Sequence, residues 1–233
     1  MAYIDKHGVE YTNDKKTLVR CPKGFKGEYI IPKTVNEIDD FAFSGCKGLS
    51  YVFIPDSVKE IGKNAFAGCR GISSIHLPNS ITRIYEGTFN NCSNLISINI
   101  PHSVERIDGN PFVGCKKLQV LSVGVEEFNS MYGYSSSSSM NLVRVFGTQV
   151  TKIILEDSVK CLHLDSFTML ENLESIVLPN SLEGVERSLM FPEDIFNGCV
   201  KLREIIIPKG KKKRFKEMFG VGWDYIAGGI VER

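Results

Sequence analysis

The residues most capable of chemistry in this sequence are its seven cysteines, five of which occupy a recurring position. Four stand 23 residues apart and the fifth takes the same place in a later copy: Cys46, Cys69, Cys92, Cys115, then Cys199. A recurring thiol suggests a metal site or redox pairs, but metal sites usually place two ligands within a few residues. Leu170 fills the same position in one copy, and free cysteine is often buried as a small apolar side chain. We therefore predict a column of structural thiols; Cys21 and Cys161 fall outside it and receive no assignment.

The sequence contains four histidines, and none belongs to a recognisable catalytic motif: His7, His76, His102 and His163. None lies beside a nucleophile elbow, a C-x-x-C pair or an H-E-x-x-H segment. Many glycines recur with the same 23-residue step, so they belong to turns rather than to a phosphate-binding loop. We predict no enzyme activity, no cofactor and no metal ion. An active site assembled by folding is the alternative, and it requires a deep pocket with clustered titratable groups.

One cluster of positive charge stands near the C-terminus, although the net charge of the chain is only +1. Its members are Lys209, Lys211, Lys212, Lys213, Arg214 and Lys216. Such a cluster can bind nucleic acid or an anionic surface. It also fits the solvated face of a terminal helix, where lysines hinder end-to-end stacking of molecules. We favour the solvated face, because no basic or aromatic pattern elsewhere extends the cluster, and we do not expect a nucleic-acid partner.

The positions of these residues follow a 23-residue internal repeat. The same step separates a proline column and a phenylalanine column: Pro32, Pro55, Pro78, Pro101 and Phe43, Phe66, Phe89, Phe112. One unit reads I-P-x-S-V-x-x-I-x-x-x-A-F-x-G-C-x-x-L-x-x-I-x. After an irregular stretch the step resumes, with Glu156 in place of proline, Pro179 next, and Pro208 after an insertion around Ser188–Glu193.

Each part of the unit has a physical reading. The end of the L-x-x-I-x-I segment alternates inward and outward, which predicts a strand, and the following proline ends it. The A-F-x-G-C segment returns a phenylalanine and a thiol to the interior on the opposite wall. One unit cannot bury its apolar side alone, but stacked units can, because their strands pair about 4.8 Å apart. The sequence therefore predicts an α/β solenoid: a curved horseshoe with parallel strands on the concave face and short helical or irregular turns on the convex face.

The unit resembles the 23-residue leucine-rich repeat of the BspA-like bacterial surface proteins, most clearly in IPDSVKEIGKNAFAGCRGISSIH at residues 54–76. The resemblance covers roughly residues 18–225, and its proline, serine, Ala-Phe and Gly-Cys positions all fall in place. It implies a secreted or surface-attached protein for adhesion or interaction. Residues 1–10 lack the basic start and apolar run of a secretory signal, so the residues alone lead us to expect a cytoplasmic protein. No stretch approaches the ~18 apolar residues of a membrane span.

We predict a single repeat domain over residues 1–233. Its parts are a cap hairpin at 1–24, repeats at 25–208 with an irregular unit at 125–155, and a second cap at 209–233. The caps hide the apolar cross-sections at the two ends of the stack. The irregular unit includes the serine run Ser135–Ser139, which we interpret as a tolerated loop, with a binding loop as the alternative.

Residue types at the two ends support these caps. Tyr11-Thr12 and Thr17–Val19 flank a polar turn, which predicts a hairpin. Near the C-terminus, apolar residues at helical spacing predict a helix that ends at Gly220, followed by bulky residues that cover the last strand: Phe215, Met218, Phe219, then Trp223, Tyr225 and Ile226.

The outward positions of the strands map the surface that would meet a partner. One column reads Ile30, Phe53, His76, Asn99, Ser122, Ile154, Val177 and Ile206, and its neighbour reads Glu28, Tyr51, Ser74, Ser97, Val120, Lys152, Ser175 and Glu204. Tyr51 and Phe53 beside Ile30 would form an exposed apolar patch, which is typical of partner contact, unless a cap or a second molecule covers it. We hypothesise a non-catalytic protein-interaction or adhesion scaffold without a small-molecule substrate. Its concave-face contacts would be Glu28, Ile30, Tyr51, Phe53, Ser74, His76, Ser97 and Asn99.

Overall fold

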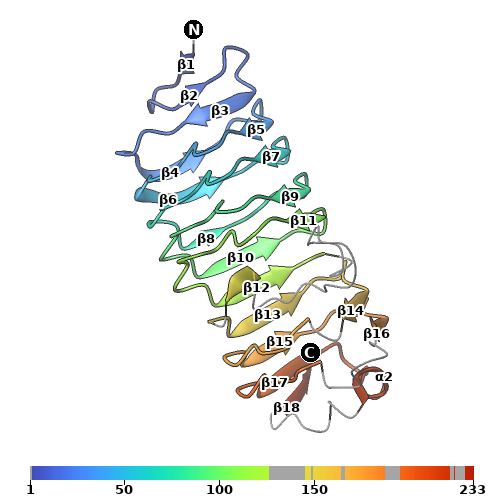
Figure 1. Cartoon of the computed structure of the whole chain (residues 1–233). Coiled ribbons are helices and arrows are strands. Elements are labelled where there is room, and N and C mark those ends of the chain that lie inside the picture. The colour runs from blue at the N-terminus through green and yellow to red at the C-terminus, as the bar shows by residue number, and fades with distance from the viewer. Residues whose placement is uncertain are drawn as a thin grey trace. The chain divides into compact units, whose positions relative to one another are not determined.

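The computed structural model describes residues 2–125, 145–147, 149–163, 166–186, 195–220, 223 and 229–233. It divides into two compact units, Met1–Leu118 (unit 1) and Gln119–Arg233 (unit 2). In both units short strands from successive coils stack side by side, with little helix (Figure 1). The predicted single domain over 1–233 stays a prediction. The serine run Ser135–Ser139 and the insertion Ser188–Glu193 lie outside the described residues.

In unit 1, strands from successive coils form two ladders. Its strands are β1 (Tyr3–Ile4), β2 (Glu10–Tyr11), β3 (Thr17–Arg20), β4 (Lys26–Ile30), β5 (Glu37–Ile38), β6 (Gly48–Phe53), β7 (Glu60–Ile61), β8 (Ser74–Ile75), β9 (Arg83–Ile84), β10 (Ser97–Ile100) and β11 (Arg106–Ile107). The strands that precede the prolines pair in parallel as β4–β6 and β8–β10. The strands that follow the prolines form a second ladder, in which β5 pairs in parallel with β7, and β9 with β11. The cap strand β3 pairs in parallel with β5 and extends this ladder.

Unit 2 repeats this arrangement. Its elements are β12 (Val120–Val123), β13 (Lys152–Leu155), β14 (Cys161–His163), β15 (Ser175–Val177), β16 (Gly184–Glu186), β17 (Glu204–Ile207), α2 (Lys212–Phe219) and β18 (Gly229–Glu232). The order β12-β13-β15-β17-β18 is parallel throughout, and β14 pairs in parallel with β16. The long irregular unit keeps this alignment, because Val120 pairs with Lys152 and Val123 with Leu155.

The phenylalanine column forms a continuous stack inside unit 1. The ring centroids of Phe43, Phe66, Phe89 and Phe112 are 5.0, 5.8 and 5.4 Å apart in succession, and adjacent rings lie within 9° of parallel. All four side chains are buried. In unit 2, Phe167 and Phe196 stack at 5.7 Å. Each ring therefore shields the faces of its neighbours from water, which is how the 23-residue step becomes a core.

The recurring thiols bind the backbone of the preceding coil. Cys69 Sγ lies 3.1 Å from the Phe43 carbonyl oxygen, and three further members repeat this contact: Cys92 to Phe66 at 3.1 Å, Cys115 to Phe89 at 3.1 Å, and Cys199 to Phe167 at 3.0 Å. Cys46 Sγ, in the first coil, lies 3.6 Å from the Cys21 carbonyl oxygen. Burial raises the pKa of Cys69, so it remains a neutral thiol. The predicted structural column is confirmed: all five side chains are buried.

The two cysteines outside the column take other places in the coil. The Cys21 N–H donates to the Ala42 carbonyl at 2.7 Å, as the Phe43 N–H donates to Ala65 at 2.7 Å. Cys21 therefore stands at the head of the phenylalanine column. Cys161 belongs to β14 and is half-buried.

Turns rather than helices make the A-F-x-G-C wall. The N–H of Cys69 returns to the Phe66 carbonyl at 3.1 Å, and the same bond joins Cys92 to Phe89 at 3.1 Å. Gly68 has a φ of +73°, in the left-handed region that favours glycine. This explains why glycine precedes the cysteine in the repeat.

Both ends show the expected cap elements. The predicted hairpin is confirmed, because β2 pairs antiparallel with β3 and Tyr11 faces Leu18. The predicted C-terminal helix is also confirmed as α2, whose Phe215 and Phe219 are buried. Trp223 stacks on Phe219 at 5.7 Å, while Tyr225 and Ile226 lie outside the described residues. No helical segment of the described residues has the length and apolar composition needed to cross a bilayer.

Candidate partner-binding face

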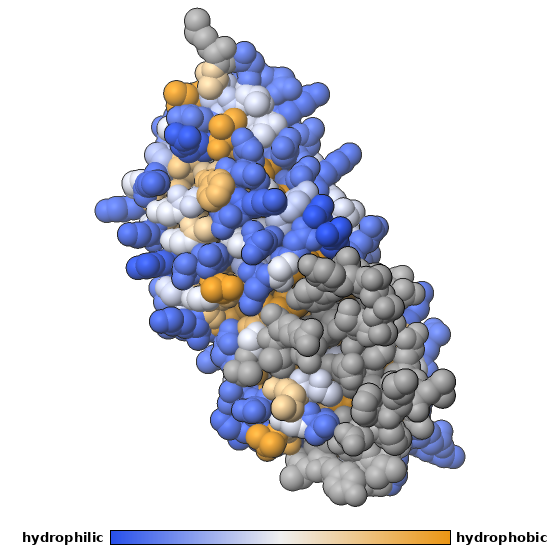
Figure 2. Space-filling model, viewed as in Figure 1, coloured by the Kyte–Doolittle hydropathy of each residue, from blue (hydrophilic) through white to orange (hydrophobic). Residues whose placement is uncertain are grey.

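The exposed apolar patch lies on two paired strands, β4 and β6. Their register places Ile30 beside Phe53 and Glu28 beside Tyr51, while Tyr29 and Val52 point inward. The exposed fractions are 71% for Ile30, 42% for Phe53 and 40% for Tyr51. These three residues are the strand-face patch. The alternative that the N-terminal cap covers them is wrong, and Figure 2 shows apolar surface at this end among mostly hydrophilic residues.

The other predicted contacts of unit 1 lie on β8 and β10 or just beyond β8. Ser74 pairs with Ser97 in the parallel register, and His76 is exposed. Asn99 is already engaged: its Oδ1 accepts the Leu77 N–H at 2.8 Å and its Nδ2 donates to the Leu77 carbonyl at 3.1 Å. The amide thus extends the ladder beyond the end of β8, so a partner would have to displace it.

The outward columns of unit 2 are more enclosed. Lys152, Ser175 and Val177 are half-buried. Ser122 donates to Glu156 Oε1 at 2.7 Å. Ile206 was expected to point outward, but the structure buries it to 6% exposure. It pairs with Val177 on one side and Val231 on the other, because β18 adds a strand that the repeat pattern did not predict. The exposed apolar part of the mapped face is therefore the strand-face patch of unit 1.

A hollow of about 550 Å³ lies between β4 and the N-terminal cap. Its lining residues are Tyr3, Asp5, Lys6, His7, Glu28, Tyr29, Ile30 and Pro32. We call it the cap hollow. No pattern in the sequence indicates this hollow, because the cap residues lie outside the repeat and have no column to align with.

A hydrogen-bonded group of side chains fixes one wall of the cap hollow. Tyr29 Oη donates to Asp5 Oδ2 at 2.6 Å, and Tyr11 Oη meets Tyr29 Oη. The N–H groups of His7 and Val9 donate to Asp5 Oδ1 at 2.8 and 2.9 Å. Burial alone would raise the pKa of Asp5, but the Tyr29 hydroxyl and these N–H groups hold that pKa below its usual value.

Asp5→Asn is expected to lower the free energy of unfolding by about 1–2 kcal/mol at pH 7, because a charged acceptor of several hydrogen bonds is lost. The folded pKa of Asp5 is depressed, so its contribution exists above its unfolded pKa of about 3.9 and disappears as the pH falls through the folded value. In urea unfolding, the difference in stability between the two proteins should therefore shrink as the pH is lowered below about 3.9. Asp56→Asn, at an exposed aspartate after β6, is the matched control and should change little. A difference that stays the same from pH 7 down to the lowest pH at which both proteins fold would contradict the assignment.

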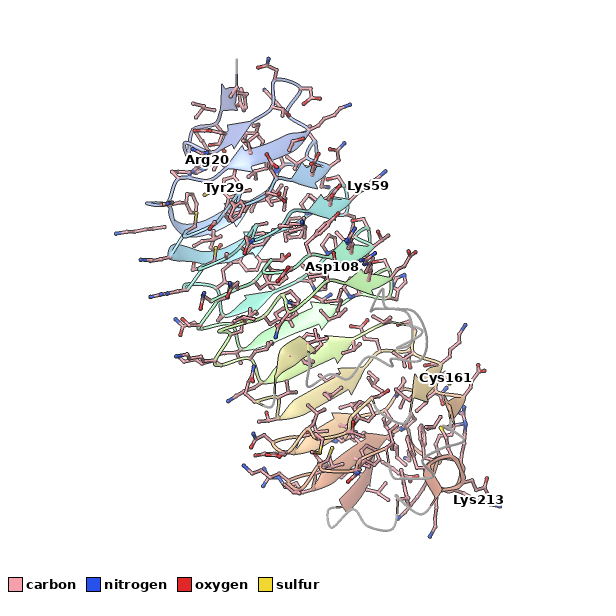
Figure 3. All side chains as sticks on the ribbon, in the orientation of Figure 1. Arg20, Tyr29, Lys59, Asp108, Cys161 and Lys213 are labelled. Carbon is pink, nitrogen blue, oxygen red and sulfur yellow. The ribbon has the colours of Figure 1, made fainter. Side chains whose placement is uncertain are left out.

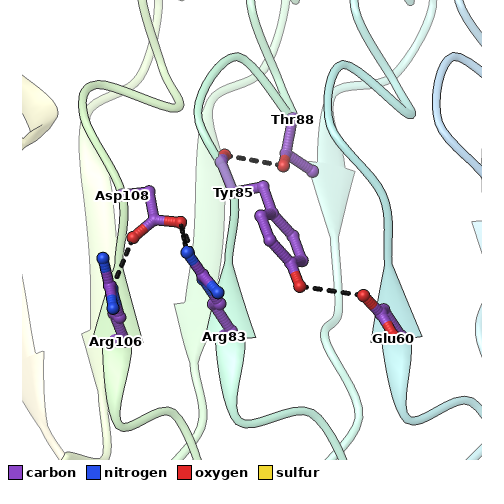
Figure 4. A network of polar contacts seen from close by, with 6 residues as sticks. All are labelled: Glu60, Arg83, Tyr85, Thr88, Arg106 and Asp108. Carbon is purple, nitrogen blue, oxygen red and sulfur yellow. Dashed lines mark hydrogen bonds and ion pairs between the residues drawn. The ribbon is translucent and has the colours of Figure 1, made fainter.

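The second ladder of unit 1 carries a polar network (Figure 4). Asp108 accepts from Arg83 Nε at 2.7 Å and from Arg106 Nε at 2.6 Å. Tyr85 Oη donates to Glu60 Oε1 at 2.8 Å, and the Arg83 guanidinium lies 4.5 Å from the Tyr85 ring centroid. These contacts join β7, β9 and β11. Exposed ion pairs contribute little individually, so we interpret the network as ties between coils.

The basic cluster lies on and beside α2. Arg214 donates to the Asn180 carbonyl at 3.2 Å and also reaches the Leu182 carbonyl, so it anchors the helix. Lys213 is highly exposed and points away from the strands (Figure 3). Glu232 Oε1 accepts the Lys212 N–H at 3.1 Å, which places a carboxylate at a helix N-terminus that has no acidic residue of its own. The arrangement fits the solvated face; the absence of a nucleic-acid partner stays a prediction.

Among the described residues, no three histidine, cysteine, aspartate or glutamate side chains gather as metal ligands would. The stacked parallel strands, one ladder before and one after each proline position, define a leucine-rich-repeat solenoid. The family model of the BspA type leucine rich repeat region matches in six copies over residues 26–142 and 145–221. The chain belongs to this family.

Solved structures support the same fold. A leucine-rich repeat protein from Eubacterium ventriosum is 22% identical, with a TM-score of 0.60 over 84% of this chain and 49% of that one. The pneumococcal vaccine antigen PcpA is 17% identical, with a TM-score of 0.58 over 100% of this chain and 48% of that one. The T. pallidum leucine-rich repeat protein is 21% identical, with a TM-score of 0.54 over 100% and 96%. This chain spans about half the length of the first two. No curated protein matches the sequence.

Proposed function

We propose that this protein is a non-catalytic scaffold for protein interaction or adhesion, which binds its partner through the strand-face patch. The observation that carries the proposal is the exposure of Ile30, Tyr51 and Phe53 on two paired strands. Tyrosine provides a large contact area at a low entropic cost, and it is one of the residues that dominate binding energies at interfaces. In the predicted horseshoe this is the concave face.

The surrounding residues support a role in binding rather than catalysis. Glu28, Ser74 and His76 surround the patch with polar side chains, as the rim of a protein interface does. The family supports the interaction or adhesion role. The resemblance also supports a secreted or surface-attached location, so extracellular partners belong in the test.

The test is capture on a panel of purified extracellular-matrix proteins and bacterial lysate fractions. The variant Tyr51→Ser/Phe53→Ser is expected to weaken capture at least ~30-fold, because two central contacts of ~1 kcal/mol or more each are lost. Its thermal midpoint should change little, since both side chains are partly solvated already. The matched control is Phe41→Ser/Val113→Ser, which removes exposed apolar side chains from the turns of unit 1.

Two results would count against the proposal. Undiminished capture by Tyr51→Ser/Phe53→Ser would move the contact surface elsewhere. Loss of folding in that variant would show that these side chains belong to the core.

A further inference from the structure

Within the described residues, strand β4 is paired along one of its two edges. It joins β6 in a two-stranded ladder. The cap strands β1, β2 and β3 continue the other ladder, next to β5 and β7 (Figure 1). In the described residues, the ladder that carries the strand-face patch therefore begins with β4 and has an open edge.

The register identifies the backbone groups at that edge. The Ile31 N–H donates to the Phe53 carbonyl at 3.1 Å, so residue 31 faces β6. Because backbone groups alternate sides along a strand, the N–H and C=O groups of Glu28 and Ile30 face away from β6. The nearby cap turn is bonded to itself, with Asp5 N–H on the Val9 carbonyl and Gly8 N–H on the Asp5 carbonyl, both at 3.0 Å. No backbone hydrogen bond from a described cap residue reaches Glu28 or Ile30.

The cap hollow lies along this same edge. Its wall combines Glu28, Tyr29 and Ile30 of β4 with cap residues, and no residue of β6 lines it. A volume of about 550 Å³ is within the range of ligand-sized pockets. The open edge of β4 thus borders a hollow that can hold a short extended peptide.

We propose that an extended peptide segment of the protein partner adds to β4 as a further parallel strand. Glu28 and Ile30 offer two N–H donors and two carbonyl acceptors, which is how added strands gain affinity. The side-chain columns set the chemistry of the segment. An apolar residue would stand beside Ile30 and continue the column of Ile30 and Phe53, and a basic residue would pair with the exposed carboxylate of Glu28. The inference rests on the proposed function, because the same partner would cover the strand-face patch.

The surroundings of β4 limit what can bind. The bulge between Gly27 and Glu28 interrupts the ladder on one side, and Pro32 ends it on the other, so the open edge is short. The cap residues Asp5, Lys6 and His7 stand across the hollow from this edge. The Tyr29 hydroxyl ties Asp5 to β4 at 2.6 Å, so an extended segment would lie along the backbone edge of Glu28 and Ile30 and would not pass between Asp5 and Tyr29. The folded edge of a second copy would have to displace the cap.

The probe is a synthetic peptide that copies residues 49–55 with Tyr51→Lys, since residues 49–53 belong to the strand that already pairs with β4. Hydrogen exchange by NMR on the full chain gives the readout. With peptide at about ten times its Kd, exchange of the Glu28 and Ile30 amides should slow about tenfold. The Tyr29 and Ile31 amides, already directed toward β6, should not change. Ile30→Pro removes the edge donor and should abolish the slowing of the Glu28 amide. Ile30→Ala keeps the donor and loses only the side-chain contact, so it should bind the peptide more weakly but still slow the Glu28 amide at about ten times its own Kd.

Several outcomes would overturn strand addition. One is the absence of slowing at peptide concentrations up to ~1 mM, which would detect binding as weak as about −4 kcal/mol. Another is that the peptide slows exchange of the Glu28 amide as much in the Ile30→Pro protein as in the unsubstituted protein. A third is a dimer in solution whose Glu28 and Ile30 amides are protected without peptide, because a second copy would then occupy the edge. The Tyr51→Ser/Phe53→Ser protein separates the two proposals. It keeps the edge amides, so amide protection by the peptide with undiminished partner capture would refute only the strand-face patch.

Discussion

Phe66→Ala is expected to lower the free energy of unfolding by about 3–5 kcal/mol. The Phe66 ring is fully buried and stacks on Phe43 at 5.0 Å and on Phe89 at 5.8 Å, within 9° of parallel on both sides. Its removal leaves a cavity in the middle of the stack and uncovers one face of each neighbouring ring. The Phe66 carbonyl oxygen also accepts a hydrogen bond from the Cys92 thiol at 3.1 Å, so a local shift of the backbone would disturb the next coil.

Urea unfolding followed by circular dichroism measures this loss. The matched control is Phe53→Ala, which removes the same side chain from an outward position of 42% exposure and should cost less than about 1 kcal/mol. Similar losses in the two variants would mean that the phenylalanine column does not carry the core.

The column residues could be predicted from the sequence because every coil places the same side chain at the same depth. A phenylalanine and a cysteine that return every 23 residues must line up when coils stack in register, and both columns are buried as predicted. The acceptor of each thiol could not be predicted. Cysteine and leucine fill this column equally well, as Leu170 shows, and spacing alone says nothing about which carbonyl lies above the sulfur.

The features that could not be predicted from the sequence are those that the 23-residue spacing does not determine. Strands such as Glu60–Ile61 are two residues long, too short to show alternation, so in the repeat unit the second ladder corresponds only to the isoleucine of the S-V-x-x-I segment. Asn99 stood in the outward column, but its side-chain bonds to Leu77 depend on β8 ending early. The cap hollow depends on contacts between Asp5 and Tyr29, which are 24 residues apart and belong to no column.

The backbone of neighbouring coils approaches most closely at some of the glycines, and Gly71 provides the sharpest test of this packing. A Cβ on Gly71 would overlap the Leu49 carbonyl oxygen and stand 2.9 Å from that of Lys47. Gly71→Ala should therefore lower the free energy of unfolding by about 1–3 kcal/mol or more, because backbone atoms of the adjacent coil must move. The matched control is Gly24→Ala, where nothing lies within 4 Å of the added Cβ; it should cost nothing and stabilise by up to ~1 kcal/mol.

The same substitution connects packing to binding. Leu49 belongs to β6, the strand that carries Tyr51 and Phe53, so a displaced Leu49 carbonyl would alter the position of the strand-face patch. We expect Gly71→Ala to weaken partner capture under conditions where the protein is still folded, and Gly24→Ala to leave it unchanged. Equal stability and equal capture in the two variants would show that the coils can separate at this point without cost. The close stacking of backbone on which the strand-face patch depends would then be refuted.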